Sequence, residues 1–223
     1  MQGQPPALQD RQRRTLVLGI GNVLWADEGF GVRCVEALEQ RYVFPEQVSL
    51  VDGGTQGLYL VPYVQSADRL LIFDAIDYGL EPGSLHLVRN ADVPRFMGAK
   101  KLSLHQTGFQ EVLSLAELLG GYPEEVLLIG CQPETLEDFG GSLSPVVRQT
   151  LSRALALGVE QLAAWGVPPS PRTAADALQL SAARAALDLA PYEAGRPDES
   201  QAERRGDPRF MSQAQMPPTV EHG

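Results

Sequence analysis

Two carboxylates and one histidine are the side chains of this chain whose types and places could do chemistry. Glu28 lies in the segment LVLGIGNVLWADEGFG, Asp74 follows the apolar run RLLIF, and His105 follows KKLSL. Of the three histidines, His105 is the best placed, because His222 lies near the C-terminus and His86 alternates with leucines. An imidazole and two carboxylates form a donor set for nickel, zinc or iron, and the residues alone do not choose among these metals.

Each of these residues also has a purely structural interpretation. Asp27 and Glu28 could be first-turn acids of a helix, where the helix dipole favours negative charge. His105 could cap the helix that follows it. Asp74 is harder to explain, because an unpaired aspartate directly after an apolar strand costs free energy unless it meets water, a donor or a metal. The presence of all three favours a shared site.

An open α/β sheet is the scaffold that the sequence predicts for these residues. Apolar runs predict strands over residues 15–20, 48–51, 69–73, 84–88 and 126–130, and helical patterns alternate with them over 29–41, 57–65, 106–119 and 145–165. The alternation predicts a three-layer sandwich, in which a mostly parallel, twisted sheet of five strands has helices on both faces. Ligands bind at the carboxyl ends of such strands, so the three side chains should converge on one crevice.

The composition changes on both sides of the predicted sheet. We expect a flexible leader over residues 1–13, a catalytic α/β domain over 14–167, and a flexible appendage rich in proline and alanine over 168–223. The appendage holds 8 of the 17 prolines and contains one helical pattern, over about 173–189.

The charge and the cysteine content exclude several classes of protein. The net charge is −10 and the pI is near 4.8, so nucleic acid is not an expected partner. Two cysteines at unrelated positions do not suggest a disulfide scaffold, which fits a reducing compartment. The sequence has no apolar run of membrane-spanning length and no secretory signal, so we expect a cytoplasmic protein without membrane insertion.

A nucleotide-binding enzyme on a Rossmann-like sheet is the main alternative interpretation. Gly19-Ile-Gly21 follows the first strand, but Leu24 stands where that motif needs its third glycine. Asp27 and Glu28 would also repel phosphate groups. The usual zinc-protease helix motifs and the Gly-x-Ser-x-Gly elbow are absent from the sequence, and no serine or cysteine nucleophile is evident, so we expect no acyl-enzyme.

The segment Asp52-Gly53-Gly54-Thr55 is a second candidate for binding. Its glycines allow a close approach of backbone to a bound peptide, although a tight turn whose aspartate caps the next helix explains the segment equally well.

Six segments, in order and over about residues 14–166, resemble the nickel–iron hydrogenase maturation endopeptidases. They are LVLGIGN, the D-E-G-x-G segment at 27–31, DGGT at 52–55, DAID at 74–77, SLHQTG at 103–108, and IGCQPE at 129–134. The resemblance implies an endopeptidase that removes the C-terminal peptide of a hydrogenase large-subunit precursor after nickel insertion. Within this family, the sequence resembles most the enzymes that serve uptake hydrogenases.

The resemblance also implies roles for residues. Glu28, Asp74 and His105 would contact nickel that the precursor supplies, and the loop at 52–55, above all Asp52, would help to select the precursor. The metal would orient the substrate and polarise the scissile carbonyl, and Glu28 or Asp74 would activate water, in an aspartic-type or metal-assisted mechanism. We expect a monomer. A nickel-sensing chaperone that binds the precursor without cutting it stays open as a further alternative.

Overall fold

The structure is a computed structural model that describes residues 12–94, 104–173 and 189–195; for residues 104–108 and for Pro191 only the backbone is described. Five strands form one sheet in the order β3-β1-β4-β6-β5. Their bounds are β1 Thr15–Ile20, β3 Val48–Gly54, β4 Arg69–Ala75, β5 Leu85–Arg89 and β6 Glu125–Cys131. Only β5 runs antiparallel to its neighbour, so the predicted mostly parallel sheet is confirmed.

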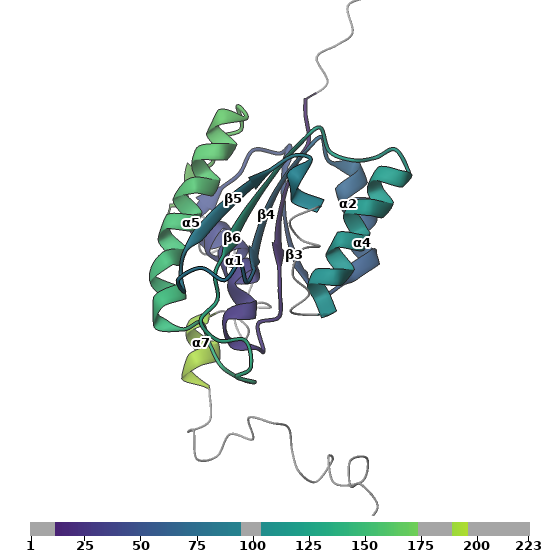
Figure 1. Ribbon diagram of the computed structural model, residues 1–223. Coiled ribbons are helices and arrows are strands. Elements are labelled where there is room, and N and C mark those ends of the chain that lie inside the picture. Colours follow the sequence, from purple (N-terminus) through teal and green to yellow (C-terminus); the bar gives the residue numbers. More distant parts are fainter. Residues whose placement is uncertain (1–11, 95–103, 174–188, 196–223) are drawn as a thin grey trace, which may run out of the picture.

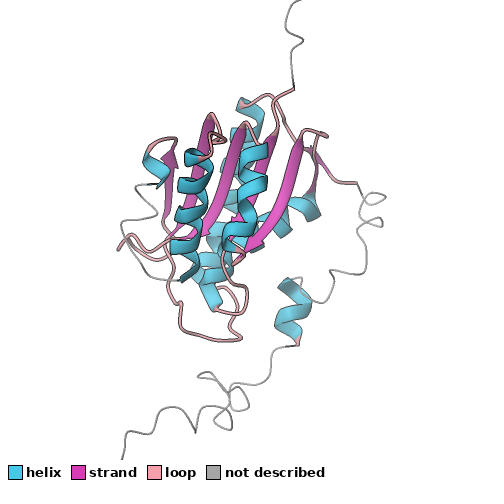
Figure 2. Cartoon of the chain, turned by 90° about the vertical axis from the view of Figure 1, so that its right-hand side faces the viewer, coloured by secondary structure: helices cyan, strands magenta, loops and turns pink. Residues whose placement is uncertain are grey.

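Helices cover both faces of the sheet, as the three-layer prediction requires (Figure 1). α1 (Phe30–Arg41) and α5 (Pro145–Ala164) lie on one face, whereas α2 (Val61–Ser66) and α4 (Leu104–Leu118) lie on the other, where Figure 2 shows helices in front of the strands. Short 3-10 turns precede α1 and α2, as η1 (Ala26–Gly29) and η2 (Gly57–Leu60). Among the described residues, no helix is long and apolar enough to cross a membrane.

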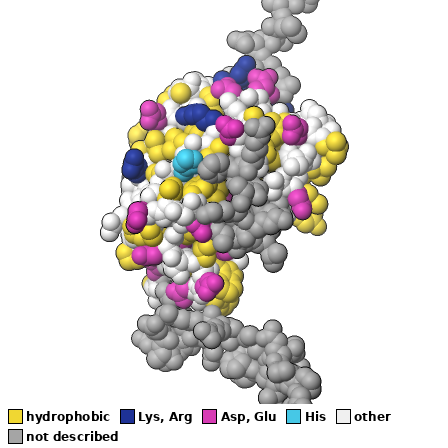
Figure 3. Space-filling model, viewed as in Figure 1, with side chains coloured by type: hydrophobic (Ala, Val, Ile, Leu, Met, Phe, Trp, Pro, Cys, Tyr) yellow, Lys and Arg dark blue, Asp and Glu magenta, His cyan; other side chains and the backbone are white. Residues whose placement is uncertain are grey.

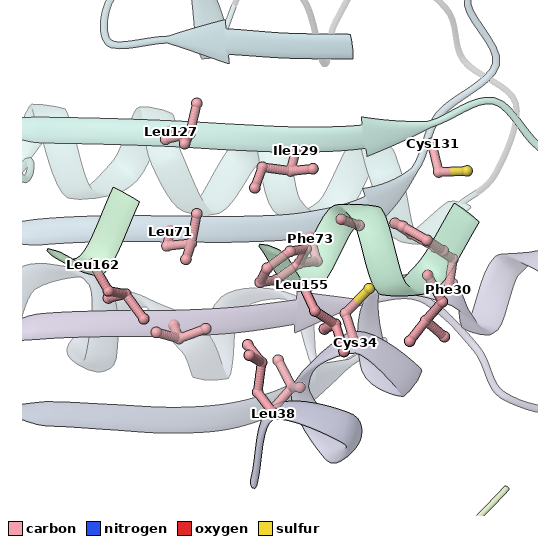
Figure 4. Close-up of a cluster of buried hydrophobic side chains, with 14 of the residues drawn as sticks. Phe30, Cys34, Leu38, Leu71, Phe73, Leu127, Ile129, Cys131, Leu155 and Leu162 are labelled. Atoms are coloured by element: carbon pink, nitrogen blue, oxygen red, sulfur yellow. The ribbon is translucent and has the colours of Figure 1, made fainter. Parts of the chain in front are cut away.

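Two hydrophobic cores, one on each face, hold these layers together. β1, β4 and β6 are buried almost along their whole length, as expected for central strands between two helical layers. Figure 4 shows the core under α1 and α5, where the side chains of Phe73, Ile129 and Leu155 meet. The continuous apolar runs in the sequence therefore correspond to strands that are covered on both sides.

The alternation of side chains along β4 decides which way Asp74 points. Phe73 belongs to the core under α1 and α5, while Ile72 belongs to the core under α2 and α4. Successive residues of a strand point to opposite faces, so Asp74 projects toward the layer of α2 and α4. The strand was predicted to end at Phe73, but pairing with β6 continues to Ala75, and Asp74 lies inside the strand.

Two described segments of the chain beyond residue 167 contact the domain. β7 (Ser170–Pro171) pairs with β2 (Tyr42–Val43), and the Arg172 guanidinium donates to the Glu39 and Tyr42 carbonyls. The leader through residue 11 and nearly all of the helix predicted over 173–189 lie outside the described residues.

α7 (Leu189–Ala194) is the second contact of this segment. Its Glu193 carboxylate forms an ion pair with Arg148 and accepts a hydrogen bond from the Ser142 hydroxyl. The guanidinium of Arg33 lies over the Tyr192 ring, 5.1 Å from its centroid. The segment therefore packs against α1 and the start of α5.

Candidate active site

β1 and β4 are neighbours in the middle of the sheet, and the chain leaves them in opposite directions. After β1 it crosses to β3 on one side, and after β4 it moves toward β5 and β6 on the other. The connections therefore diverge beyond the carboxyl ends of β1 and β4, which is where open α/β sheets bind ligands. Glu28, in η1, follows β1, and Asp74 is the penultimate residue of β4.

Two glycines let the start of α1 approach these strand ends. A Cβ atom on Gly31 would lie 2.1 Å from the Phe73 carbonyl oxygen, and one on Gly21 would lie 1.8 Å from that of Glu28. Gly21 also has a φ of +130°, which side-chain-bearing residues rarely adopt. The glycines after β1 thus hold the Glu28 turn against the sheet, and this packing explains them without a bound nucleotide.

Asp74 is a buried carboxyl group with an unusual environment. It is 0% exposed, and neither of its oxygens has a hydrogen-bond partner among the described residues. Burial raises the pKa of Asp74 well above its usual range, and the negative charge of Glu28 raises it further, while the nearby Ala75 amide offsets only part of this effect. Such a group is expensive to keep charged unless a cation completes its surroundings.

Glu28 is the second acid of this pair. Its side chain is half-buried, and burial raises the pKa of Glu28 to about 7. Glu28 is close enough to raise the pKa of Asp74 through its charge, so the structure brings together the two predicted carboxylates. A divalent cation would stabilise both carboxylates in their charged form, and these residues therefore fit a metal.

His105 is the second residue of α4, which begins two residues before the predicted start at residue 106, so His105 does not precede the helix as a cap. α4 covers the face toward which Asp74 projects, and the backbone of His105 is on the same side of the sheet. The His105 side chain lies outside the described residues, and its part in the site stays a prediction. Among the side chains that are described, no three His, Cys, Asp or Glu residues form a metal-binding group.

Asp27 has a role that the sequence analysis missed. Its buried carboxylate accepts hydrogen bonds from the backbone amides of Glu134 (2.9 Å), Thr135 (3.0 Å) and Ser144 (2.7 Å). Asp27 therefore points inward and ties the loop after β6 to the turn that carries Glu28, instead of facing a ligand. Asp27 and Glu28 are adjacent, and the sequence does not show that only Asp27 binds these amides. The amides belong to a segment more than a hundred residues further along the chain.

Gln132 and Tyr78 are further residues that only the fold brings near the site. The buried Gln132 side chain accepts from the Tyr78 and Leu80 amides and donates to Asp77, whose carboxylate also accepts from the Gly79 amide. Asp77 thus stabilises the turn at Gly79. Burial and the charge of Asp74 raise the pKa of Tyr78, whose hydroxyl lies over Gly130.

The segment 52–55 lies at the same end of the sheet. Its strand was predicted to end at residue 51, but β3 continues to Gly54, because Asp52 and Gly54 still pair with β1. Asp52 and Thr55 are exposed, whereas Gly53 is buried and Gly54 is half-buried. The Gly54 carbonyl accepts a hydrogen bond of 3.1 Å from the Gly21 amide, which joins the end of β3 to the loop after β1. Asp52 and Thr55 thus present side chains to solvent, and the two glycines serve the packing of the strand end.

Comparison with known proteins agrees with this geometry. Residues 32–161 match the family model of the hydrogenase maturation proteases. The chain is 60% identical over 200 residues to the hydrogenase expression/formation protein HoxM of Cupriavidus necator, covering 89% of this chain and 98% of that protein.

Two solved structures have the same fold. The hydrogenase maturating endopeptidase HybD from Escherichia coli superposes with a TM-score of 0.68 at 41% identity, over 71% of this chain and 98% of that one. The [NiFe] hydrogenase maturation protease HycI from Thermococcus kodakarensis gives a TM-score of 0.54 at 27% identity, over 68% and 93% of the two chains. The chain described here belongs to the hydrogenase maturation protease family and is a peptide hydrolase.

Proposed function

We propose that this protein removes the C-terminal peptide of a nickel–iron hydrogenase large-subunit precursor after nickel has been inserted. The observation that carries the proposal is the buried Asp74 carboxyl group, which has no hydrogen-bond partner among the described residues and lies beside Glu28. The resemblance in sequence favours an uptake hydrogenase as the source of the precursor. We expect the enzyme to act in the cytoplasm and as a monomer.

Nickel belongs to the substrate in this proposal. Glu28, Asp74 and His105 would bind the ion that the precursor presents, and an incompletely coordinated ion bound there would polarise the scissile carbonyl. A precursor without nickel would leave the buried Asp74 carboxyl group without a cation to stabilise its charged form. The cost of that arrangement gives a physical reason why only the loaded precursor would be cut.

Glu28 is the better candidate for the general base. It is half-buried and thus open to water on one side, so an attacking water could reach it. Asp74 is fully buried, so we assign it to binding and to the exclusion of water from the other side. The attacking water would pass its proton to Glu28, which could then protonate the leaving amine.

Mass spectrometry of the precursor's C-terminus tests the proposal. Incubation with the wild-type protein should shorten the nickel-loaded precursor by a defined peptide and leave the nickel-free precursor intact. A precursor that is bound but keeps its full mass would show a chaperone instead of a protease.

Glu28→Gln and His105→Ala should each lower the rate of this cleavage by at least about 100-fold, since each removes a group that acts on the reacting atoms or their metal. The measurement is the cleavage rate on the loaded precursor, with folding checked by circular dichroism. His86→Ala is the matched control for the histidine, because His86 lies on β5 and packs on the Tyr78 ring. Cleavage at the wild-type rate by His105→Ala would remove His105 from the site.

Asp52→Ala should change the selectivity between precursors more than the cleavage rate of the cognate precursor. Asp52 is exposed and lies on the edge strand β3, near the carboxyl end of the sheet. We expect a shift of about 10-fold in the ratio of kcat/KM for two competing precursors, as for the loss of one charged contact. Ser49→Ala, at another exposed position of β3, is the control. An unchanged ratio would contradict a role for Asp52 in selectivity.

A further inference from the structure

Two large apolar side chains are exposed directly beside the proposed active site. Leu24 is 42% exposed and Phe139 is 41% exposed, and they come from the loops that follow β1 and β6. Trp25 follows Leu24 in the chain and packs edge to face on the Phe139 ring, with centroids 5.2 Å apart. We call these three residues the apolar ridge. They lie beyond the carboxyl ends of β1 and β6, because they belong to the loops that follow these two parallel strands.

The apolar ridge is held in place by its own hydrogen bonds. Trp25 forms β-bridges with Phe139 and Gly141, and the Gly140 amide donates to the Leu24 carbonyl at 2.7 Å. Asp27 fixes the base of the β6 loop through three backbone amides. Ala26, between the ridge and Asp27, has a φ of +41°, a left-handed conformation that a residue with a side chain adopts only when its surroundings impose it. The fold therefore holds exposed apolar groups in one position.

The apolar ridge adjoins the turn that carries Glu28. The Glu28 amide donates a hydrogen bond of 2.9 Å to the Trp25 carbonyl, so the two residues belong to the same turn of chain. A peptide bound with its scissile bond at Glu28 is therefore near the segment that carries Leu24 and Trp25, against which Phe139 packs. The substrate's own peptide is thus the molecule that the position of the ridge selects.

The charge around the ridge indicates the chemistry of that peptide. Residues 22–32 and 131–147 contain five acidic residues and no lysine or arginine. Arg33 and Arg148 follow these segments directly, and each forms an ion pair, with Glu36 and Glu193 respectively. Asp27 is occupied with backbone amides, but Glu134 and Glu137 are exposed. In Figure 3 the described basic side chains of the visible face lie in its upper half and acidic ones predominate in the lower half. Charge complementarity favours a partner that carries positive charge.

We propose that the apolar ridge docks the precursor's peptide next to the scissile bond, by binding a segment that combines a large apolar side chain with a basic residue. This inference rests on the proposed function and names the part of the substrate that the protein recognises. Burial of exposed apolar side chains in a rigid frame gives affinity at a small entropic cost.

Kinetics of cleavage of the nickel-loaded precursor test this docking site. Leu24→Ser and Phe139→Ser should each raise KM by about 10-fold while kcat stays within about twofold, because they remove binding that is equal in the ground and transition states. Phe139→Leu should retain most of the affinity. The control is Leu118→Ser, since Leu118 is 81% exposed but lies at the end of α4, at the opposite end of the sheet.

The charged part of the proposal has its own test. Glu134→Gln combined with Glu137→Gln should raise KM at low ionic strength, and the difference from wild type should shrink as salt screens the charges. If KM rises for Leu24→Ser and Phe139→Ser but not for the double glutamine variant, the requirement for a basic residue in the peptide is overturned.

The outcomes separate this proposal from the proposed function. A wild-type protein that leaves the loaded precursor intact overturns the function itself. A wild-type protein that cleaves, together with Leu24→Ser and Phe139→Ser variants of unchanged KM, overturns only the docking site. If Phe139→Ser lowers the melting temperature strongly, Leu24→Ser decides, because the Leu24 side chain takes no part in the ring contact with Trp25.

Discussion

Asp74→Asn is expected to abolish cleavage and at the same time to stabilise the metal-free protein. The carboxyl group is fully buried without a hydrogen-bond partner among the described residues, so its charged form is costly, and an amide of the same shape avoids that cost. We expect a gain of about 1–3 kcal/mol in the free energy of unfolding at neutral pH. The amide is a poor metal ligand, and cleavage should fall by at least about 1000-fold.

The stability gain should depend on pH in a defined direction. Burial raises the folded-state pKa values of Asp74 and Glu28, so the folded protein binds protons more tightly than the unfolded chain. For such groups the stabilisation is present below the unfolded pKa, near 4, and is lost as the pH rises through the folded pKa, about 7 for Glu28. Stability of the metal-free wild type should therefore fall between about pH 4 and pH 8, and Asp74→Asn should flatten this fall.

Thermal unfolding across this pH range, together with the cleavage assay, checks the prediction. Asp77→Asn is the matched control: the remaining oxygen can still accept from the Gly79 amide and the Gln132 side chain, so cleavage and stability should change little. A less stable Asp74→Asn protein would contradict the conclusion that the Asp74 carboxyl group is buried at a cost in free energy.

Asp27→Ala should have the largest destabilising effect in the site. It leaves the amides of Glu134, Thr135 and Ser144 without their acceptor, and we expect a loss of about 3–5 kcal/mol in the free energy of unfolding. Asp27→Asn keeps the shape but turns one oxygen into a donor that faces an amide. It should lose less stability than Asp27→Ala and still lower kcat, because Glu28 is the next residue along the chain.

Chemical denaturation measures this effect, with Glu46→Ala as a control at an exposed acid between β2 and β3. The expected order of stability is wild type, Asp27→Asn, Asp27→Ala. If Asp27→Ala were as stable as Glu46→Ala, the hydrogen bonds to the β6 loop would not be what holds the Glu28 turn.

The sequence by itself determined the layers of the fold and the identity of the acidic pair. The run at residues 15–20 was predicted to the residue, and that at 69–73 as a core strand, because strands covered on both faces must be apolar along their whole length. An aspartate after such a run is costly enough to stand out in the sequence alone, which is why Asp74 could be singled out. The segments shared with the maturation endopeptidases then indicated the family, and the comparisons confirm it.

The tertiary structure decided which role Asp27 and Glu28 each have. Asp27 and Glu28 are neighbours of similar chemistry, and nothing local distinguishes the one that binds three amides from the one that faces Asp74. The strand order, with β1 beside β4, and the position of the β6 loop make that distinction. The same holds for the apolar ridge, where Leu24 meets Gly140, 116 residues further along the chain, and Trp25 meets Phe139, 114 residues further along. Periodicity and burial cost are properties of a short segment, whereas these contacts exist only once distant strands are aligned in one sheet.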